Sequence, residues 1–493
     1  MKDKALSLPS ESHNNRITFF MNGQQITEEL PAGISTLDWL NQTKQMFGTK
    51  CSCNEGDCCS CTVVIAKAVD DKVIYEAITS CLYPAAKLHG KHLITIEAMG
   101  TPNALHPIQQ ALLDHHGTQC GYCTPGFVMS MFALFAMHNH PDKEAIFAAL
   151  EGNLCRCTGY QSILDAALEI SRNYCKEDLI PAWCSEVESK LLEKGVPAAM
   201  LLLHKDSNRL VSKYLMPETM KLLFDYLQTE NSAVVIAGGT DLMVQMNIGR
   251  KEFPVLIDIT CIEELKRIYL QSDGLHIGAC VSYAKMFDSE LVHNSCPHLH
   301  KLISQIASQQ IRNFGTLGGN IANASPVGDT LPLLLALDAT LRLQTELEMR
   351  QLPIRSFFKG YRQTALQKRE IIKEIILPLS PENSYVRTLK SAKRKSVDIS
   401  AVVSAINLQR SLGYTQNACL AFGGVAATPL VSRVFTGLVN NKPLSSLDAA
   451  QIAKAVAAEF KPLSDVRGSA LYRNKLIENH VIIYLSELQK EVL

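Results

Sequence analysis

Sixteen cysteines occur among the 493 residues, and ten of them lie between Cys51 and Cys157. Within that stretch, three cysteines follow the spacing Cys-x4-Cys-x2-Cys and a fourth comes later in the chain. These four are Cys53, Cys58, Cys61 and Cys81. The spacing suits a 2Fe–2S cluster, because each of its two irons needs two thiolates. A tight loop can wrap three thiolates around the irons, and another segment must supply the fourth. We therefore predict an iron–sulfur cluster at these positions.

The same four thiolates could instead hold one structural zinc ion. Zinc sites usually combine two short Cys pairs, which this spacing lacks, so a cluster is favoured. Gly56 lies within the loop and permits a positive φ where backbone amides must approach sulfur. Cys51 and Cys59 are spare thiols that could substitute as ligands, but Cys53 gives the fitting register.

A second group of cysteines has a Cys-x2-Cys pair, a helical excursion and a Cys-x-Cys pair. Its members are Cys120, Cys123, Cys155 and Cys157. By spacing alone the group could hold either zinc or a second 2Fe–2S cluster. Its position directly after the first group favours a cluster, because a redox centre is useful only with an electron acceptor nearby. The remaining six cysteines are scattered, and we expect small buried hydrophobic residues there: Cys175, Cys184, Cys261, Cys280, Cys296 and Cys419.

The elements that must position these groups change character along the chain. The first hundred residues predict short strands around an Asn22-Gly23 hairpin turn, followed by a capped helix that starts near Ser35. Between Pro107 and Asn173, apolar residues recur three and four positions apart, which is typical of helices. Farther along, strand-like runs alternate with helical stretches; the runs are 233–239, 254–259, 275–279 and 371–377.

Composition excludes several classes of protein. Charged residues make up 19% of the chain and Lys+Arg 48 balance Asp+Glu 48, so no basic surface favours nucleic acid or an anionic membrane. The longest apolar run, Phe127 to Met137, is far short of the roughly 20 residues that span a bilayer. Residues 1–16 hold no apolar core for a signal peptide. We therefore expect a cytoplasmic protein, in which dense thiols indicate metal or redox chemistry rather than disulfides.

Three cysteine-rich segments resemble the N-terminal iron–sulfur half of the xanthine dehydrogenase/aldehyde oxidase family. They are GTKCSCNEGDCCSCTV (48–63), QCGYCTPGFVMSM (119–131) and EGNLCRCTGY (151–160). The chain departs from the family's glycine-rich loop at Ser52, Asp57, Cys59 and Ser60, where small residues, mostly glycine, are usual. The resemblance extends from about residue 16 to about residue 490.

Two glycine-rich stretches lie in the second half, VVIAGGTDLMVQM (234–246) and IRNFGTLGGNIANASPVGD (311–329). The first is a strand running into Gly238-Gly239 and a helix expected to begin at Thr240-Asp241. Amides at such a turn can take a pyrophosphate, although a plain turn is the alternative. Both stretches resemble the FAD-binding domain of the same family. That resemblance implies FAD contacts at Val235, Ile236, Ala237, Gly238, Gly239, Thr240, Asp241 and Leu242, and at Thr316, Leu317, Gly318, Gly319 and Asn320.

The resemblance places four more residues at the flavin. Asp329 would accept hydrogen bonds from a ribityl or ribose hydroxyl, and the alternative is a carboxylate that caps the next helix. Lys390 would stabilise the reduced ring, and the alternative is a solvated basic loop. Ile306 stands where some relatives place an aromatic ring against the flavin, although core packing explains it equally well. Ile372 lies on a late strand that borders the ring.

The implied fold class is α+β multidomain. It combines a β-grasp plant-type ferredoxin domain, a helical 2Fe–2S domain, a two-part α+β FAD-binding domain (non-Rossmann, PCMH/VAO-like) and an α+β C-terminal flavoprotein domain. The expected boundaries are a flexible N-terminus (1–15), the plant-ferredoxin-like domain (16–98), the helical 2Fe–2S-binding domain (99–175), a linker (176–212), the FAD-binding domain (213–383) and the flavoprotein C-terminal domain (384–493).

The implied function is electron transfer in a molybdenum hydroxylase. Hypoxanthine and xanthine would be oxidised to urate on a molybdopterin-binding large subunit, so no hydroxylation residue is expected here. Electrons would pass through the Cys120 group and then the Cys53 group to FAD and to NAD+ as cosubstrate. Because the chain ends at Leu493, we expect the molybdenum half on a separate chain, in a heterotetramer of two small and two large subunits.

Three alternatives remain open for the sequence. The chain could serve an aldehyde, CO or aromatic acyl-CoA oxidoreductase of the same superfamily. It could be a zinc-stapled scaffold without a redox role, or an electron-transfer adaptor without flavin. The choice between NAD+ and O2 as the final acceptor is open as well.

Overall fold

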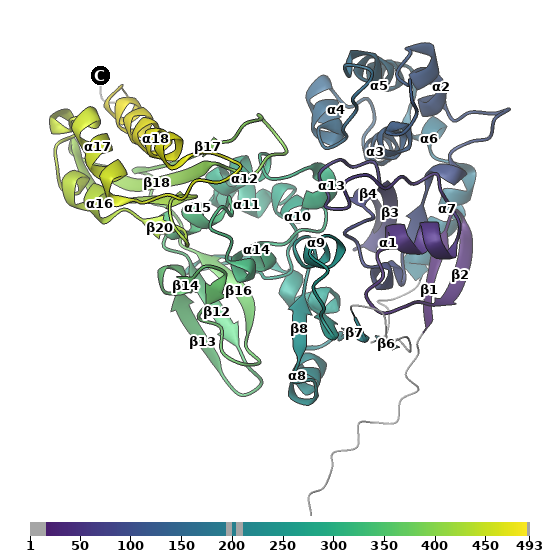
Figure 1. Cartoon of the computed structure of the whole chain (residues 1–493), viewed down its shortest axis with the longest axis horizontal. Coiled ribbons are helices and arrows are strands. Elements are labelled where there is room, and N and C mark those ends of the chain that lie inside the picture. The colour runs from purple at the N-terminus through teal and green to yellow at the C-terminus, as the bar shows by residue number, and fades with distance from the viewer. Residues whose placement is uncertain (1–15, 194–199, 204–210, 491–493) are drawn as a thin grey trace, which may run out of the picture.

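The computed structural model describes residues 16–193, 200–203 and 211–490, so the predicted flexible N-terminus (1–15) lies outside the described residues. Figure 1 shows several α+β units side by side, with the N-terminal units at one side and the C-terminal sheet at the other. The expected multidomain α+β class is confirmed. Among the described helices, none is long and apolar enough to cross a membrane.

The first unit is a mixed sheet with short helices. Its elements are β1 (Arg16–Met21), β2 (Gln24–Glu29), α1 (Thr36–Asp38), η1 (Trp39–Thr43), β3 (Thr62–Val69), β4 (Lys72–Thr79), η2 (Ala85–Leu88), β5 (His92–Ile94) and η3 (Ile96–Ala98). The strand order is β2-β1-β5-β3-β4. The predicted hairpin is confirmed, because Asn22 and Gly23 form a two-residue turn in which both residues have positive φ. Ser35 caps α1 by accepting a hydrogen bond from the Asp38 N–H at 3.0 Å.

The second unit is helical, as its periodicity predicts. Its helices are α2 (Pro107–Asp114), α3 (Thr124–Met137), α4 (Lys143–Leu150) and α5 (Gln161–Asn173). Helix α3 is apolar on nearly all sides because it packs against β3 and β4 as well as against α2 and α4. The cysteines of the second group lie just before α3 and α5, so the packing of these two helices sets their positions.

The segment 176–212 differs from the predicted linker. It begins with two helices, α6 (Lys176–Leu179) and α7 (Ala182–Glu193), and β6 (Met200–Leu203) follows. Helix α7 packs against β3 and β4, and its Cys184, Val187 and Leu191 are buried in the core of the helical unit. These three residues form a narrow stripe of about one apolar residue per turn. So narrow a stripe lacks the apolar repeat from which a helix is predicted, and the sequence therefore did not predict this helix.

The central unit contains two sheets. The first sheet, ordered β6-β7-β9-β8, and its helices comprise β7 (Lys213–Met216), α8 (Met220–Thr229), β8 (Ala233–Ile236), α9 (Leu242–Asn247) and β9 (Val255–Asp258). Three of its strands, β7, β9 and β8, are parallel. The second sheet is antiparallel and comprises β10 (Ile268–Gln271), β11 (Gly274–Gly278), β16 (Ile371–Leu377), β12 (Thr340–Gln344) and β13 (Met349–Pro353), in that order.

Short helices and two small strands complete the central unit. They are η4 (Ile259–Cys261), η5 (Glu263–Lys266), α10 (Tyr283–Phe287), α11 (Glu290–Ser295), α12 (Pro297–Ile303), α13 (Gln309–Arg312), α14 (Leu317–Asn323), α15 (Leu331–Ala336), η6 (Ile354–Ser356), β14 (Phe358–Gly360) and β15 (Gln363–Thr364). Helix α9 begins at Leu242 rather than at the predicted Thr240, and Asp241 is its N-cap residue.

The last unit is an antiparallel sheet with helices on one face. Its elements are β17 (Ser384–Ser391), β18 (Val402–Ser411), β19 (Tyr414–Gly423), β20 (Leu430–Val431), α16 (Arg433–Val439), η7 (Leu444–Ser446), α17 (Ala449–Glu459) and α18 (Ala470–Lys490). Neighbouring residues of β18 point to opposite faces. Ile406 packs with the helices of this unit, whereas Ala405 joins the core of the central unit.

Continuous hydrophobic cores join the units. Phe19, Trp39 and Leu93 of the first unit belong to the same buried cluster as Met243 and Leu256 of the central unit. The central unit shares a second cluster with the inner face of the C-terminal sheet. Because buried side chains are closely packed, these shared cores hold the cysteine loops and the glycine-rich stretches in one arrangement.

Candidate redox and flavin site

The first cysteine group lies on the loop before β3 and on the turn after β4. Its thiols stand in two pairs: Cys53 contacts Cys58, and the Cys61 and Cys81 Sγ atoms are 3.4 Å apart. The Glu55 N–H donates to the Cys53 sulfur at 3.5 Å. The loop turns at Gly56, where φ is +86° and an added Cβ would come within 2.6 Å of the Leu82 side chain. The backbone therefore approaches the sulfurs as an iron–sulfur centre requires.

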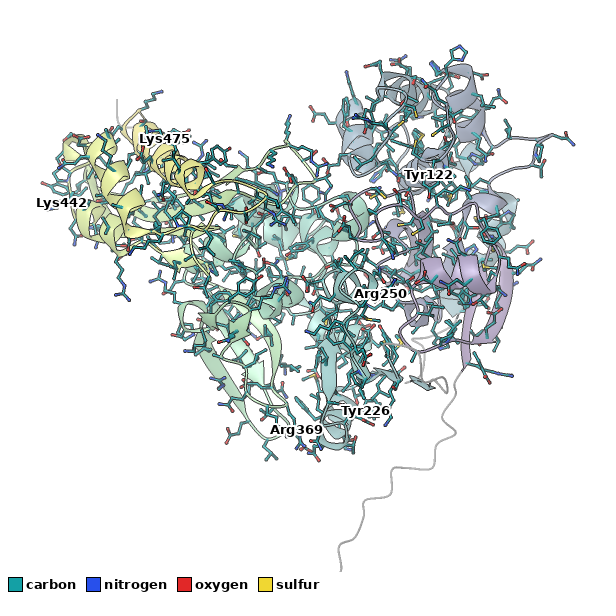
Figure 2. All side chains as sticks on the ribbon, in the orientation of Figure 1. Tyr122, Tyr226, Arg250, Arg369, Lys442 and Lys475 are labelled. Carbon is teal, nitrogen blue, oxygen red and sulfur yellow. The ribbon has the colours of Figure 1, made fainter. Side chains whose placement is uncertain are left out.

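The two spare cysteines make hydrogen bonds to other parts of the molecule. The Cys59 thiol is fully buried and donates to the Ser308 hydroxyl of the central unit at 3.6 Å, and burial raises its pKa above the ordinary value. Cys51 is exposed, and its carbonyl accepts a hydrogen bond from the hydroxyl of Tyr122. Figure 2 labels Tyr122. Both positions agree with the register in which Cys53, not a spare thiol, completes the group.

The second cysteine group is also arranged in two pairs. The Cys120 and Cys157 sulfurs are 3.7 Å apart, and Cys123 contacts Cys155. The Thr158 N–H donates to the Cys155 sulfur at 3.5 Å. Cys120 and Cys157 are exposed, whereas Cys155 is buried, so one edge of this group faces the outside of the molecule.

Both groups fit a two-iron centre better than a single ion. A 2Fe–2S cluster takes two thiolates on each iron, and each group offers two thiol pairs. A structural zinc ion takes all four ligands on one tetrahedral centre.

Hydrogen bonds join the two cysteine groups directly. The Leu154 N–H, next to Cys155, donates to the Cys58 carbonyl at 3.1 Å. The Asn153 amide donates to the Cys59 carbonyl at 3.1 Å and accepts from the Ser130 hydroxyl of α3 at 2.8 Å. The contact leaves little space, because a Cβ on Gly126 would lie 2.5 Å from the Cys59 carbonyl oxygen. Sequence spacing did not single out Asn153 or Ser130, since their partners are distant in the chain.

The two glycine-rich stretches meet in the central unit. A Cβ on Gly238 would lie 2.3 Å from the Phe314 carbonyl oxygen, and Gly239 has a φ of +85°. In the second stretch, a Cβ on Gly318 would lie 2.5 Å from the Ala279 carbonyl oxygen, and the Thr316 hydroxyl accepts from the Gly319 N–H at 3.1 Å. The structure therefore brings the turn at Gly238 against Phe314 and Gly315, directly before Thr316–Asn320, at a place where only glycine fits. Such a cradle suits close approach of a phosphate to backbone amides.

We expect Gly238→Ala to disturb this cradle. The added methyl group cannot fit beside the Phe314 carbonyl without moving backbone, and such overpacking costs about 1–3 kcal/mol. FAD content should fall with the melting temperature, measured by flavin fluorescence after denaturation and by thermal unfolding. Gly437→Ala in α16 is the control, because a Cβ there meets nothing within 4 Å and should leave FAD content unchanged. Unaltered FAD content in Gly238→Ala would contradict the assignment of this turn.

Two residues outside the predicted set hold Asp241 in place. The Arg362 guanidinium lies 3.2 Å from the Asp241 carboxylate, and the Asn323 amide donates to it at 3.1 Å. Arg362 also donates to the Asn323 side-chain oxygen at 3.1 Å. Asn323 lies within the second glycine-rich stretch but was not singled out there, and the sequence carries no signal for Arg362, which lies outside both stretches.

Asp329 and Lys390 form a buried ion pair. The Lys390 Nζ lies 2.7 Å from the Asp329 carboxylate and 2.8 Å from the Gln305 carbonyl, and its side chain is only 5% exposed. The Ser400 hydroxyl also donates to Asp329. Both alternatives are therefore wrong: Lys390 is not on a solvated loop, and Thr330 rather than Asp329 is the N-cap residue of α15.

Ile306 and Ile372 share one core. Both are buried and belong to the cluster that joins the central and C-terminal units. Gln305, the neighbour of Ile306, provides the carbonyl that binds Lys390. The flavin contact of both isoleucines stays a prediction, while their packing is a finding.

Helix α9 connects the first glycine-rich stretch to the first cysteine group. At its C-terminal end, the Asn247 amide donates to the Cys81 carbonyl at 2.9 Å and to the Asn54 carbonyl at 3.2 Å. At its N-terminal end, the helix begins three residues after Gly239, with Asp241 as its N-cap residue. One short helix therefore links the flavin-type turn with the loop that carries the thiols.

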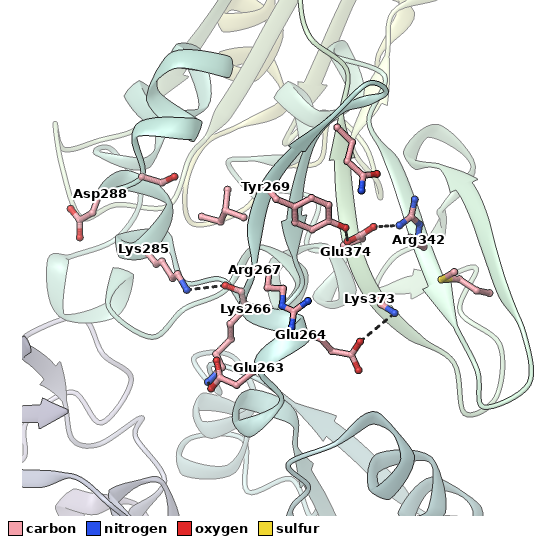
Figure 3. Close-up of a pocket in the computed structure, with 14 residues that line it drawn as sticks. Glu263, Glu264, Lys266, Arg267, Tyr269, Lys285, Asp288, Arg342, Lys373 and Glu374 are labelled. Atoms are coloured by element: carbon pink, nitrogen blue, oxygen red, sulfur yellow. Dashed lines mark hydrogen bonds and ion pairs between the residues drawn. The ribbon is translucent and has the colours of Figure 1, made fainter. Parts of the chain in front are cut away.

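The central unit carries a cavity of about 1060 Å³ over β10 and β16, whose lining includes no residue of either glycine-rich stretch (Figure 3). Its wall holds five cationic and four anionic side chains, and several of them pair, as Lys373 does with Glu264 at 3.5 Å and Arg342 with Glu374. Because the charges largely cancel, this cavity selects neither an anion nor a cation.

A second cavity, of about 530 Å³, lies beside Lys390. Its lining includes Lys393, Arg394 and Lys395, together with Gln305 and Tyr472, and it has no acidic side chain. An anionic molecule would therefore find a favourable potential next to the Asp329–Lys390 pair.

Family models match three segments of the chain. Residues 95–168 match a [2Fe-2S] binding domain, residues 209–380 match the FAD binding domain in molybdopterin dehydrogenase, and residues 387–488 match the CO dehydrogenase flavoprotein C-terminal domain. The matched segments contain the second cysteine group, both glycine-rich stretches and Lys390.

Whole proteins of similar sequence include xanthine dehydrogenase of Calliphora vicina, 29% identical over 94% of this chain and 38% of the relative. Aldehyde oxidase 2 of Rattus norvegicus is 29% identical over 98% of this chain and 40% of the relative. The chain therefore spans about two fifths of the length of these curated relatives.

Solved structures of similar fold include carbon monoxide dehydrogenase from Hydrogenophaga pseudoflava, with a TM-score of 0.52 and 27% identity over 55% of this chain and 94% of that chain. Quinoline 2-oxidoreductase from Pseudomonas putida 86 has a TM-score of 0.52 and 25% identity over 56% of this chain and 95% of that chain.

Proposed function

Since the chain belongs to the xanthine dehydrogenase/aldehyde oxidase family and carries its iron–sulfur and FAD domains, we propose that it passes electrons from purine hydroxylation on a molybdopterin-binding partner to NAD+. When bound, the two 2Fe–2S clusters would relay single electrons, and FAD would collect them in pairs for a hydride acceptor. The observation that carries the proposal is the arrangement of eight thiols as four pairs, in one packed body with the two glycine-rich stretches.

The cysteines would hold the clusters in a definite order. Cys120, Cys123, Cys155 and Cys157 would bind the outer cluster, and Cys53, Cys58, Cys61 and Cys81 the inner one. The outer group is the one with exposed thiols, and Gly121 and Gly159 leave open space around it. A partner chain that delivers electrons would therefore dock against this edge, and the Leu154–Cys58 hydrogen bond leads inward from it.

The cavity beside Lys390 supports NAD+ as the acceptor, because a dinucleotide carries phosphates and the charged side chains in the wall are all cationic. We expect Lys395→Glu to raise the KM for NADH roughly fivefold with FAD content unchanged, since an exposed charge contributes up to about 1 kcal/mol. Lys442→Glu, on the C-terminal unit (Figure 2), is the control and should leave the KM unaltered. An unchanged KM in Lys395→Glu would argue against dinucleotide binding in this cavity.

Metal and flavin analysis tests the assignment of cofactors. Anaerobically prepared protein should contain about four iron atoms and about four inorganic sulfides per chain, together with FAD. Zinc in place of iron and sulfide would refute the iron–sulfur proposal. The clusters without releasable FAD would favour the flavin-free adaptor.

Turnover measurements test whether this chain transfers electrons while its partner chain hydroxylates the substrate. The purified chain should oxidise NADH with an artificial electron acceptor and should not hydroxylate hypoxanthine. Xanthine turnover by this chain, rigorously freed of any second chain, would contradict the proposal.

The second candidate substrate class follows from the solved relatives, whose names specify carbon monoxide and quinoline. The complex of this chain with its co-purified partner should be offered xanthine, an aldehyde, carbon monoxide and quinoline separately. The substrate that bleaches the iron–sulfur absorbance fastest identifies the class, and we expect xanthine. Bleaching by carbon monoxide or quinoline alone would replace the purine assignment.

A further inference from the structure

Lys87 is a buried lysine that belongs to neither cysteine group. It lies on η2 of the first unit, is 4% exposed, and reaches into the central unit. Its Nζ is 3.3 Å from the Asp258 carboxylate at the end of β9 and donates to the Ala237 carbonyl, just after β8. One ammonium group from the first unit therefore binds the ends of two neighbouring parallel strands of the central unit.

The surroundings compensate the buried charges. Asp258 also accepts from the Tyr214 hydroxyl at 2.6 Å and from the Thr260 hydroxyl at 2.6 Å, and it is itself fully buried. The Lys87 ammonium lies 5.9 Å from the centre of the Tyr83 ring. A buried ion pair persists only when hydrogen bonds satisfy its remaining atoms, as they do here.

The contact with Ala237 has a consequence for the glycine turn. The Ala237 carbonyl and the Gly238 N–H belong to one planar trans peptide unit, so they point in opposite directions. An ammonium that holds the carbonyl on one side therefore orients the Gly238 N–H toward the other side. That N–H begins the run of backbone donors at Gly238 and Gly239. At Gly238 a Cβ would lie 2.3 Å from the Phe314 carbonyl oxygen, so the turn packs closely against the second glycine-rich stretch.

We propose that Lys87 is a positioning residue for FAD: by holding the Ala237 carbonyl, it presets the Gly238 amide as a donor to the FAD pyrophosphate. The iron–sulfur unit thereby helps to form the flavin site in addition to exchanging electrons with it. The inference rests on the proposed function, because the turn at Gly238 is assigned to FAD there.

The test compares three variants by FAD affinity and by thermal unfolding. Lys87→Met keeps the length of the side chain and removes its charge. Lys87→Met combined with Asp258→Asn also removes the unpaired carboxylate. Lys91→Met is the matched control, because the Lys91 ammonium donates to the Tyr83 hydroxyl of its own unit at 2.7 Å. FAD dissociation constants are measured by fluorescence after reversible removal of FAD, and EPR of reduced protein follows the clusters.

We expect Lys87→Met to weaken FAD binding about tenfold or more, which corresponds to 1.4 kcal/mol, and to retain both cluster signals. The double variant should regain thermal stability and still bind FAD weakly, which a merely structural role would not produce. Wild-type FAD affinity in the double variant would overturn the inference while leaving the proposed function intact. A parent protein that binds no FAD would overturn the proposed function, and this inference with it.

Discussion

Replacing one inner thiol by serine, Cys58→Ser, should abolish one of the two 2Fe–2S EPR signals and about half of the bound iron, while FAD stays bound. Cys58 is buried in contact with Cys53. Iron–sulfur clusters are held by thiolates, and a serine hydroxyl loses its proton far less readily than a thiol, so it is a much poorer ligand for iron. FAD should stay because the second glycine-rich stretch packs, through Leu317 and Ile321, in the core that the central unit shares with the C-terminal sheet.

The control for this variant is Cys175→Ser. Cys175 is one of the scattered cysteines, and the expectation that it is buried is wrong because the structure shows it exposed. Its replacement should leave the iron content and both EPR signals unchanged. Retention of both signals in Cys58→Ser would refute the assignment of Cys58 as a ligand. Loss of both signals and of FAD together would show that the inner cluster is needed for folding of the whole body.

Removing the carboxylate of the buried ion pair, Asp329→Asn, should destabilise the protein by about 3–5 kcal/mol and lower FAD content. The variant would leave the Lys390 ammonium buried without a counter-ion. Removing only one partner of a buried ion pair is strongly destabilising because the other charge stays buried and uncompensated. Chemical unfolding monitored by tryptophan fluorescence and by flavin release measures both effects.

Asp225→Asn is the matched control for the ion pair. Asp225 pairs with Lys221 at 2.9 Å, but the Lys221 side chain is 85% exposed. An exposed pair of this kind contributes about 0–1 kcal/mol, so the variant should unfold nearly as the parent does. Equal stability of the two variants would contradict the energetic role of the Asp329–Lys390 pair.

Local signals predicted much of the fold. The Asn22-Gly23 hairpin, the Ser35 cap and the strand over residues 371–377 were all expected, because each depends on neighbouring residues only. Helix α7 was missed for the same reason: half of its residues are polar, and its stability comes from a sheet far away in the sequence.

The candidate site likewise combines features that the local sequence predicted with features that only the fold revealed. Cysteine spacing predicted both four-thiol groups, and the resemblance of two glycine-rich stretches to the family's FAD-binding domain implied the flavin region. The alternatives for Asp329 and Lys390 stayed open until the fold showed them 2.7 Å apart. The hydrogen bonds that join the units were not predicted at all. Examples are the bond from the Lys87 ammonium to the Ala237 carbonyl and the bond from the Asn247 amide to the Cys81 carbonyl.

The sequence by itself determined the chemistry of this protein, because the thiols of a cluster loop and the glycines of a phosphate turn must recur at short, fixed intervals. Only the tertiary structure decided how the units meet: which thiols form pairs, which edge is exposed, and which lysine reaches the glycine turn. Contacts between distant segments depend on the packing of whole cores, and packing leaves no regular interval in the chain.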